Sequence, residues 1–74
     1  MNTFHDIVVK DGYEIVGLIC DRNKYTTRYH AIIHRVDMDD YVYCYCYDIT
    51  DGTWGQGYYF GSFDEAVKEM GRHI

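Results

Sequence analysis

Two Asp-Gly pairs constrain the fold of this 74-residue chain more than any other feature. Asp11-Gly12 and Asp51-Gly52 each separate two segments rich in β-branched and aromatic residues. Asp-Gly between such segments favours a hairpin, because type I′ turns need positive φ at both central residues. Two further polar breaks, Asp21–Lys24 and Asp37–Asp40, are short enough to join antiparallel neighbours. We therefore expect an antiparallel meander of five strands, or of four if the first segment only frays at an edge.

The C-terminal segment predicts a helix. Ser62 stands three residues before Glu65, which is the spacing of a capping box. A helical stripe of apolar residues follows at Phe63, Ala66, Val67 and Met70. Gly71 is a candidate for a left-handed cap that ends this helix. The fold class expected for residues 1–74 is a single α+β domain, in which a four- to five-stranded antiparallel sheet is packed by one C-terminal α-helix.

Side-chain alternation predicts the faces of the strands. The segment Tyr13–Asp21 is apolar on both faces, which is typical of a central strand that is covered on both sides. In the segment Tyr25–Val36, one face combines Ala31 and Ile33 with Tyr25, Thr27 and Tyr29, and we expect it to be the core face. A single helix of this length covers only one face of the sheet.

The charge of the chain argues against direct nucleic-acid binding. Twelve acids oppose seven bases, for a formal net charge of −5, whereas a duplex-binding protein neutralises phosphates with Lys and Arg. The three cysteines form no Cys-x-x-Cys pair, and reduced thiols are typical of the cytosol. Residues Met1–Lys10 show no signal-peptide pattern, and no apolar run is long enough to span a bilayer. We expect a cytoplasmic protein without a membrane segment.

Four side chains support an alternative hypothesis of a small metal-binding or thiol-based domain. Cys44 and Cys46 are expected on one strand face, and His30 and His34 on one face of the neighbouring strand. Together they would supply the four ligands of a zinc site, but their spacing matches no common zinc motif, and cysteines in strands are often small buried hydrophobic residues. The main hypothesis therefore includes no metal, no cofactor and no catalytic residue, and the chain is not expected to be an enzyme.

A stripe of tyrosines is the candidate interaction surface. Tyrosine is enriched in protein interfaces because it combines a large contact area with a polar tip. Rings that simply cover the core of a small sheet are the open alternative. The predicted partner-binding residues are Tyr41, Tyr43, Tyr45, Tyr47 and Trp54, with the acids Asp37, Asp39 and Asp40 of the polar break. We also expect a homodimer that forms through the sheet face left open by the helix, because two-fold dimers are the commonest way to cover such a face.

The last third of the chain resembles a known group of small proteins. The segment Tyr41–Asp48, the pair Asp51-Gly52, the run Gly57–Phe60 and the helix start at Ser62–Val67 together form an aromatic hairpin that leads into a capped helix. This order of features resembles small accessory proteins of phages and mobile elements, a group that includes anti-CRISPR inhibitors. The resemblance carries no catalytic residue.

The resemblance implies a non-enzymatic protein that binds a host protein. The host protein would be a basic, nucleic-acid-handling one, and acids such as Asp48 and Asp51, with those of the Asp37–Asp40 break, would lie where phosphates normally bind. Besides the metal-binding alternative, a homodimeric housekeeping protein without catalysis is a third hypothesis.

Overall fold

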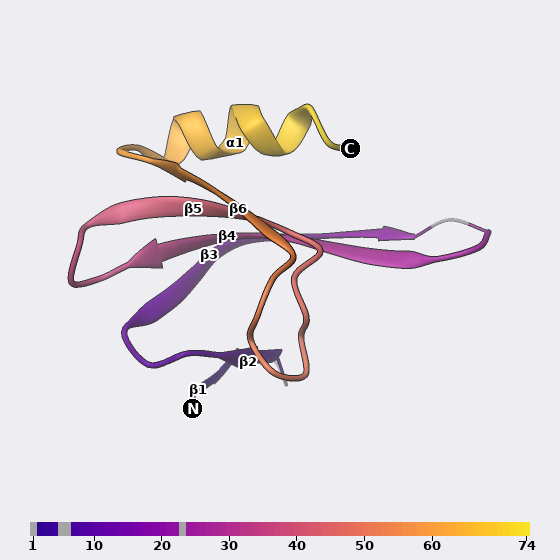
Figure 1. The fold of residues 1–74 in the computed structure, drawn as a ribbon, viewed down its shortest axis with the longest axis horizontal. Helices are drawn as coiled ribbons and strands as arrows, with labels where there is room; N and C mark the ends of the chain where they lie inside the picture. The colour runs from indigo at the N-terminus through magenta and orange to yellow at the C-terminus, as the bar shows by residue number, and fades with distance from the viewer. Residues whose placement is uncertain (1, 5–6, 23) are drawn as a thin grey trace.

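The main sheet has four antiparallel strands in the order β3-β4-β5-β6, so each strand pairs with its neighbour in the chain (Figure 1). The strands are β3 (Tyr13–Arg22), β4 (Thr27–Arg35), β5 (Asp40–Tyr45) and β6 (Gln56–Phe60), and the helix α1 (Phe63–Gly71) follows β6. The computed structural model describes residues 2–4, 7–22 and 24–74. The predicted α+β class, with an antiparallel meander and one C-terminal helix, is confirmed with four strands.

The N-terminal segment does not join this sheet. Its two strands, β1 (Asn2–Phe4) and β2 (Ile7–Val9), form a separate antiparallel pair. The predicted hairpin across Asp11-Gly12 is therefore wrong, although Gly12 has the left-handed φ of 83° that a tight turn requires. The turn leads the chain from one sheet to the other, because the backbone of β2 is held elsewhere: the Val8 N–H donates to the Ile49 carbonyl over 2.9 Å.

Strand β3 lies at the edge of the sheet, so the prediction of a central strand over Tyr13–Asp21 is wrong. The side-chain pattern was misleading because of a β-bulge between Ile15 and Gly17, which shifts the register by one residue. Ile15 and Leu18 consequently point to the same face and pack on the same hydrophobic cluster. Strict alternation would have placed them on opposite faces, which is why the segment appears apolar on both sides.

The central strands β4 and β5 are buried on both faces. One cluster joins the sheet to the helix and contains Ile32, Tyr43, Ala66 and Met70. The other cluster joins the opposite face to β2 and to the loop after β5, and contains Ile7, Ala31, Ile33, Val42, Cys44 and Tyr47. Figure 1 shows the two covering layers, with α1 on one side of the sheet and the β1–β2 pair on the other. Ala31 and Ile33 are core, as predicted, but Tyr25 and Thr27 of the same predicted face are exposed. The chain itself also covers the second face of the sheet.

The helix begins as predicted. The Ser62 hydroxyl accepts a hydrogen bond from the Glu65 N–H over 3.3 Å. Ala66 and Met70 are buried, but Phe63 and Val67 are each 39% exposed, so they border the interface with the sheet rather than fill it. The prediction of a left-handed cap at Gly71 is wrong. The helix ends at Gly71, and its C-cap is Arg72, which stays right-handed (φ −76°) and donates its N–H to the Glu69 carbonyl.

The second Asp-Gly prediction is confirmed in that β5 and β6 pair as a hairpin. The connection is longer than two residues, because Asp48 and Thr53 form an isolated bridge inside it and the tight turn lies beyond that bridge. Gly52 takes a φ of 76° there. No helix among the described residues is long and apolar enough to cross a membrane.

Candidate interaction surfaces

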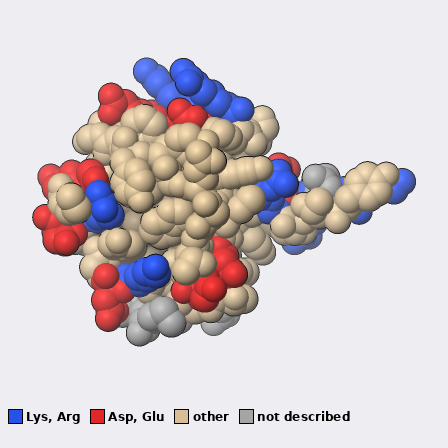
Figure 2. Space-filling view, in the orientation of Figure 1, with Lys and Arg blue, Asp and Glu red and all other residues tan. Residues whose placement is uncertain are grey.

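The turn between β4 and β5 forms an acidic end of the molecule. It spans residues 36–39 and carries Asp37 and Asp39, both exposed. Between and beside these carboxylates lie two exposed apolar side chains, Met38 (61% exposed) and Val36 (52% exposed). Figure 2 shows red acidic groups gathered around this end of the molecule. An apolar surface framed by carboxylates suits a partner that presents both apolar contacts and positive charge.

His34 links this turn to β3. Its Nδ1 lies 3.0 Å from a Glu14 carboxylate oxygen, and its Nε2 lies 2.8 Å from a carboxylate oxygen of Asp39. Hydrogen bonds to Glu14 and to Asp39 raise the pKa of His34 above its ordinary value. His34 thus contacts one acid of β3 and one acid of the turn at the acidic end. Glu14 was not among the predicted partner-binding residues, because its distance in sequence from Asp39 hides their proximity.

Asp40 differs from its neighbours because it is already paired within the protein. Both of its carboxylate oxygens accept hydrogen bonds from the Arg35 guanidinium, and the Nε–Oδ1 distance is 2.7 Å. Arg35 holds the pKa of this carboxyl below its ordinary value, and the guanidinium also lies over the Tyr59 ring, 4.9 Å from its centroid. Of the three acids predicted to bind a partner, Asp37 and Asp39 are presented outward and Asp40 is neutralised locally.

The four predicted tyrosines do not share one face. Tyr41, Tyr43 and Tyr45 lie under the helix, whereas Tyr47 packs into the cluster on the opposite face. The cause is Cys46, whose left-handed φ of 56° interrupts the alternation after β5. Tyr43 has no exposed surface and Tyr47 has 3%, so these two side chains are core in this structure. Tyr41 and Tyr45 are partly exposed at the border of the helix.

Tyr43 belongs to a buried polar and aromatic cluster beneath the end of the helix. Its hydroxyl lies 2.6 Å from His30 Nδ1, and its ring stacks on Tyr58 and lies tilted against His73. Burial raises the pKa of Tyr43 to about 12 and lowers the pKa of His30, against the opposing effect of Asp21. Both groups are therefore neutral in the fold near pH 7, and the cluster serves packing.

Trp54 packs on the side of the sheet away from the helix. Its ring stacks on Tyr47 at a centroid distance of 6.2 Å and tilts against Tyr13 at 6.1 Å. The Lys10 ammonium lies 5.7 Å from the centroid of the same ring. Trp54 is thus partly buried, and its main contacts hold the β5–β6 loop against the core.

The alternative zinc site is not assembled in the part of the chain that the structure describes. Cys44 lies opposite Ala31 and so points to the face away from the helix, whereas His30 and Tyr43 point toward the helix. Cys46 is exposed beyond the strand, and His34 is held between Glu14 and Asp39. No group of three or more His, Cys, Asp or Glu side chains suited to a metal ion was found among the described residues. The interruption at Cys46 is again the reason why the predicted pair separates.

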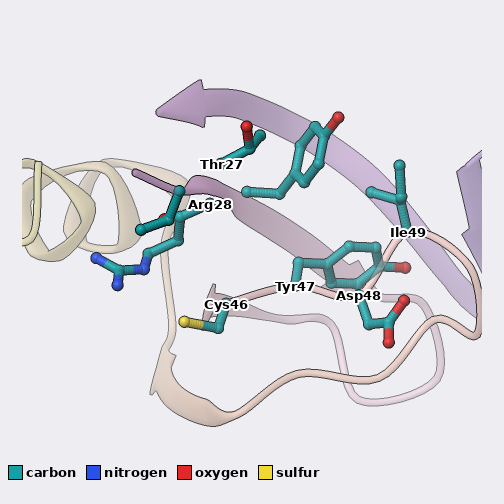
Figure 3. A pocket seen from close by; sticks show the side chains of 8 residues that line it. Thr27, Arg28, Cys46, Tyr47, Asp48 and Ile49 are labelled. Atoms are coloured by element: carbon teal, nitrogen blue, oxygen red, sulfur yellow. The ribbon is translucent and has the colours of Figure 1, made fainter. Parts of the chain in front are cut away.

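An open pocket of about 510 Å³ lies between the start of β4 and the loop after β5. Figure 3 shows Arg28 and the Cys46 thiol near one another on one side, with Asp48 and Ile49 on the other. The Asp48 carboxylate already accepts hydrogen bonds from the Thr50 N–H and hydroxyl, and these bonds lower its pKa. The Arg28 guanidinium lies over the Tyr45 ring. The charged groups thus contact the protein itself, and they do not form a converging catalytic set.

The sequence reasoning missed a second charged surface, the basic finger, which we define as the described residues 20–22 and 24–29. The ends of β3 and β4 extend here as a two-stranded projection beyond the other strands (Figure 1). The finger carries Arg22, Lys24 and Arg28, three of the seven bases of the chain, against Asp21 alone of the twelve acids. Figure 2 shows this narrow projection with blue groups along it and at its tip. Local charge along residues 21–28 would have revealed it, whereas the net charge hides it.

The molecule therefore has an acidic end and a basic finger at opposite ends of its long axis (Figure 2). No protein-family model, curated protein or solved structure matched this chain in three comparisons. A functional interpretation consequently depends on the surfaces described above.

Proposed function

We propose that this protein is a non-enzymatic interaction module that acts in the cytoplasm and binds a basic protein partner through its acidic end. The observation that carries the proposal is the β4–β5 turn, where Asp37 and Asp39 flank the exposed Met38. Complementary charge accelerates encounter, and an apolar centre supplies contact area. Asp37, Asp39 and Glu14 supply carboxylates at this end of the molecule, and His34 contacts two of them, Glu14 and Asp39.

A nucleic-acid-handling host protein is the partner class that fits this surface best. Such proteins carry Lys and Arg where phosphates bind, and an array of carboxylates competes for those side chains. The resemblance of the hairpin and helix to small inhibitors from phages and mobile elements is in keeping with this role. The protein would then act by occupying the nucleic-acid site of its partner.

The test is competitive capture from a host lysate. The wild-type protein is immobilised beside an Asp37→Asn/Asp39→Asn variant, in which shape and polarity are retained and two charges are lost. We expect the wild type to retain a nucleic-acid-binding protein that the Asp37→Asn/Asp39→Asn variant does not retain. Added DNA or RNA should release this protein from the wild type. An Asp64→Asn/Glu65→Gln variant, altered at exposed acids of the helix start, serves as the control for net charge. Equal capture by the wild type and the Asp37→Asn/Asp39→Asn variant would refute the role of the acidic end.

A further inference from the structure

Strand β3 presents an outer edge with which no other strand of the described chain pairs. The strand is ten residues long, and the part from Gly17 to Asp21 pairs with β4 in regular register. An unpaired edge exposes backbone N–H and C=O groups that can pair with another strand. Natural edges are commonly protected by Pro, Lys or a covering element, and this regular part of β3 contains neither residue. The bulge lies at its N-terminal end and the charged pair Asp21 and Arg22 at its C-terminal end, so the protected positions flank an apolar stretch from Gly17 to Cys20.

Apolar side chains accompany this edge. Ile19 is 39% exposed and Val16 is 42% exposed. The helix makes its main contacts with β4, β5 and β6, so the adjoining face of β3 is less covered. Ile19 lies opposite His30 on that face. A partner strand added to β3 would cover Ile19 and satisfy the free backbone groups in one contact.

We propose that the occupant of this edge is a second copy of the chain, paired antiparallel with β3 about a two-fold axis at Ile19. A two-fold axis perpendicular to the sheet keeps the faces of both copies continuous, so each residue must meet one from its own face. Gly17, Ile19 and Asp21 share one face, and Leu18 and Cys20 share the other. Centring on Ile19 satisfies this condition, because Ile19 meets its own copy, Leu18 meets Cys20 and Gly17 meets Asp21. A centre at Leu18 would bring the bulge opposite Cys20 and break the match.

Charge favours the same register. Because the bulge removes one step from the count, Arg22 of one copy comes level with Ile15 of the second copy, next to Glu14. The basic finger of each copy then runs beside the body of the other, which holds eleven of the twelve acids of the sequence. Two fingers side by side would repel, whereas the antiparallel arrangement places opposite charges together. The two sheets would join into one continuous sheet of eight strands. The two acidic turns between β4 and β5 would lie away from the two-fold axis.

Disulfide cross-linking tests the register directly. In a Cys20→Ser/Cys46→Ser background, an Ile19→Cys substitution places two thiols directly opposite each other across the axis, with Cα atoms about 4.5–5.5 Å apart. That distance lies within the range of about 4.4–6.8 Å that a disulfide spans. Val16→Cys is the matched control, because Val16 is about as exposed as Ile19 but would lie about 20 Å from its counterpart at the rise of a strand.

We expect a mild oxidant to convert the Ile19→Cys protein to a covalent dimer and to leave the Val16→Cys protein largely monomeric. Light scattering of the wild type should show a dimer that an Ile19→Lys substitution and high salt both weaken. Circular dichroism then checks that the Ile19→Lys variant folds, which is expected because Ile19 contributes little to the core. If this variant does not fold, the cross-linking experiment still tests the register, since it does not use the variant. A wild type that stays monomeric at all concentrations, or equal cross-linking at both positions, would overturn the proposal.

Discussion

Removal of one hydroxyl group, by Tyr43→Phe, tests the buried cluster beneath the helix. The Tyr43 hydroxyl lies 2.6 Å from His30 Nδ1, and His30 Nε2 has no hydrogen-bond partner among the described residues. The substitution keeps the ring and its packing but leaves a fully buried imidazole without a hydrogen bond. An unsatisfied buried polar group costs about 1–3 kcal/mol. For a domain of this size, each kcal/mol corresponds to a fall of about 4–8 °C in melting temperature.

The assay is thermal and urea unfolding of the wild type and of the Tyr43→Phe variant, with Tyr59→Phe as the control. Tyr59 is 53% exposed, and loss of a surface hydroxyl should change stability by less than about 0.5 kcal/mol. A Tyr43→Phe variant that unfolds with the wild type would refute the reasoning, since the hydroxyl would then contribute no net stability.

The same cluster predicts a pH dependence with a definite sign. Burial lowers the pKa of His30 below the ordinary value of 6.5, so the unfolded chain takes up a proton more readily than the fold does. The stability associated with neutral His30 is fully present above pH 6.5 and is lost as the pH falls through the pKa of the folded state. Titration of the imidazole signals by NMR should find the His30 transition on the acid side of 6.5.

Three further predictions concern the helix, a glycine turn and the acidic end. Met70→Ala should destabilise the fold by about 2–5 kcal/mol, because Met70 is buried between helix and sheet, whereas Val67→Ala should cost less than about 1 kcal/mol; equal losses in urea unfolding would contradict this packing. Gly52→Ala should lower the melting temperature, because Gly52 has a φ of 76° and a Cβ there would lie 3.2 Å from a backbone oxygen of β2; an unchanged melting curve would show that the loop relaxes freely. His34 should titrate above 6.5, and Glu14→Gln should lower its pKa, because Glu14 contributes most to the rise; an NMR titration in which the variant matches the wild type would contradict that assignment.

The sequence predicted the features that depend on local chemistry. Ser62 caps the helix where the Ser-x-x-Glu spacing predicted a start, and the break before Asp40 became the β4–β5 turn. It failed where a single residue interrupts alternation. The bulge after Ile15 and the left-handed Cys46 each move the following side chains to the other face. Gly17 hinted at the first, but a residue with a Cβ rarely adopts positive φ, so nothing in the sequence marked Cys46.

The interruption at Cys46 also explains why neither face of the central strands became a free surface, since the helix already covers Tyr41, Tyr43 and Tyr45. The expectation of an open sheet face assumed that one helix was the only cover available. In the structure, Tyr47 crosses to the second face and donates its hydroxyl proton to the Val8 carbonyl over 2.6 Å, so the loop after β5 and the N-terminal pair of strands form a second cover. The chain thus buries both faces of β4 and β5 with its own segments. Exposed apolar side chains therefore lie at the periphery of the sheet, in the acidic turn and along the outer edge of β3.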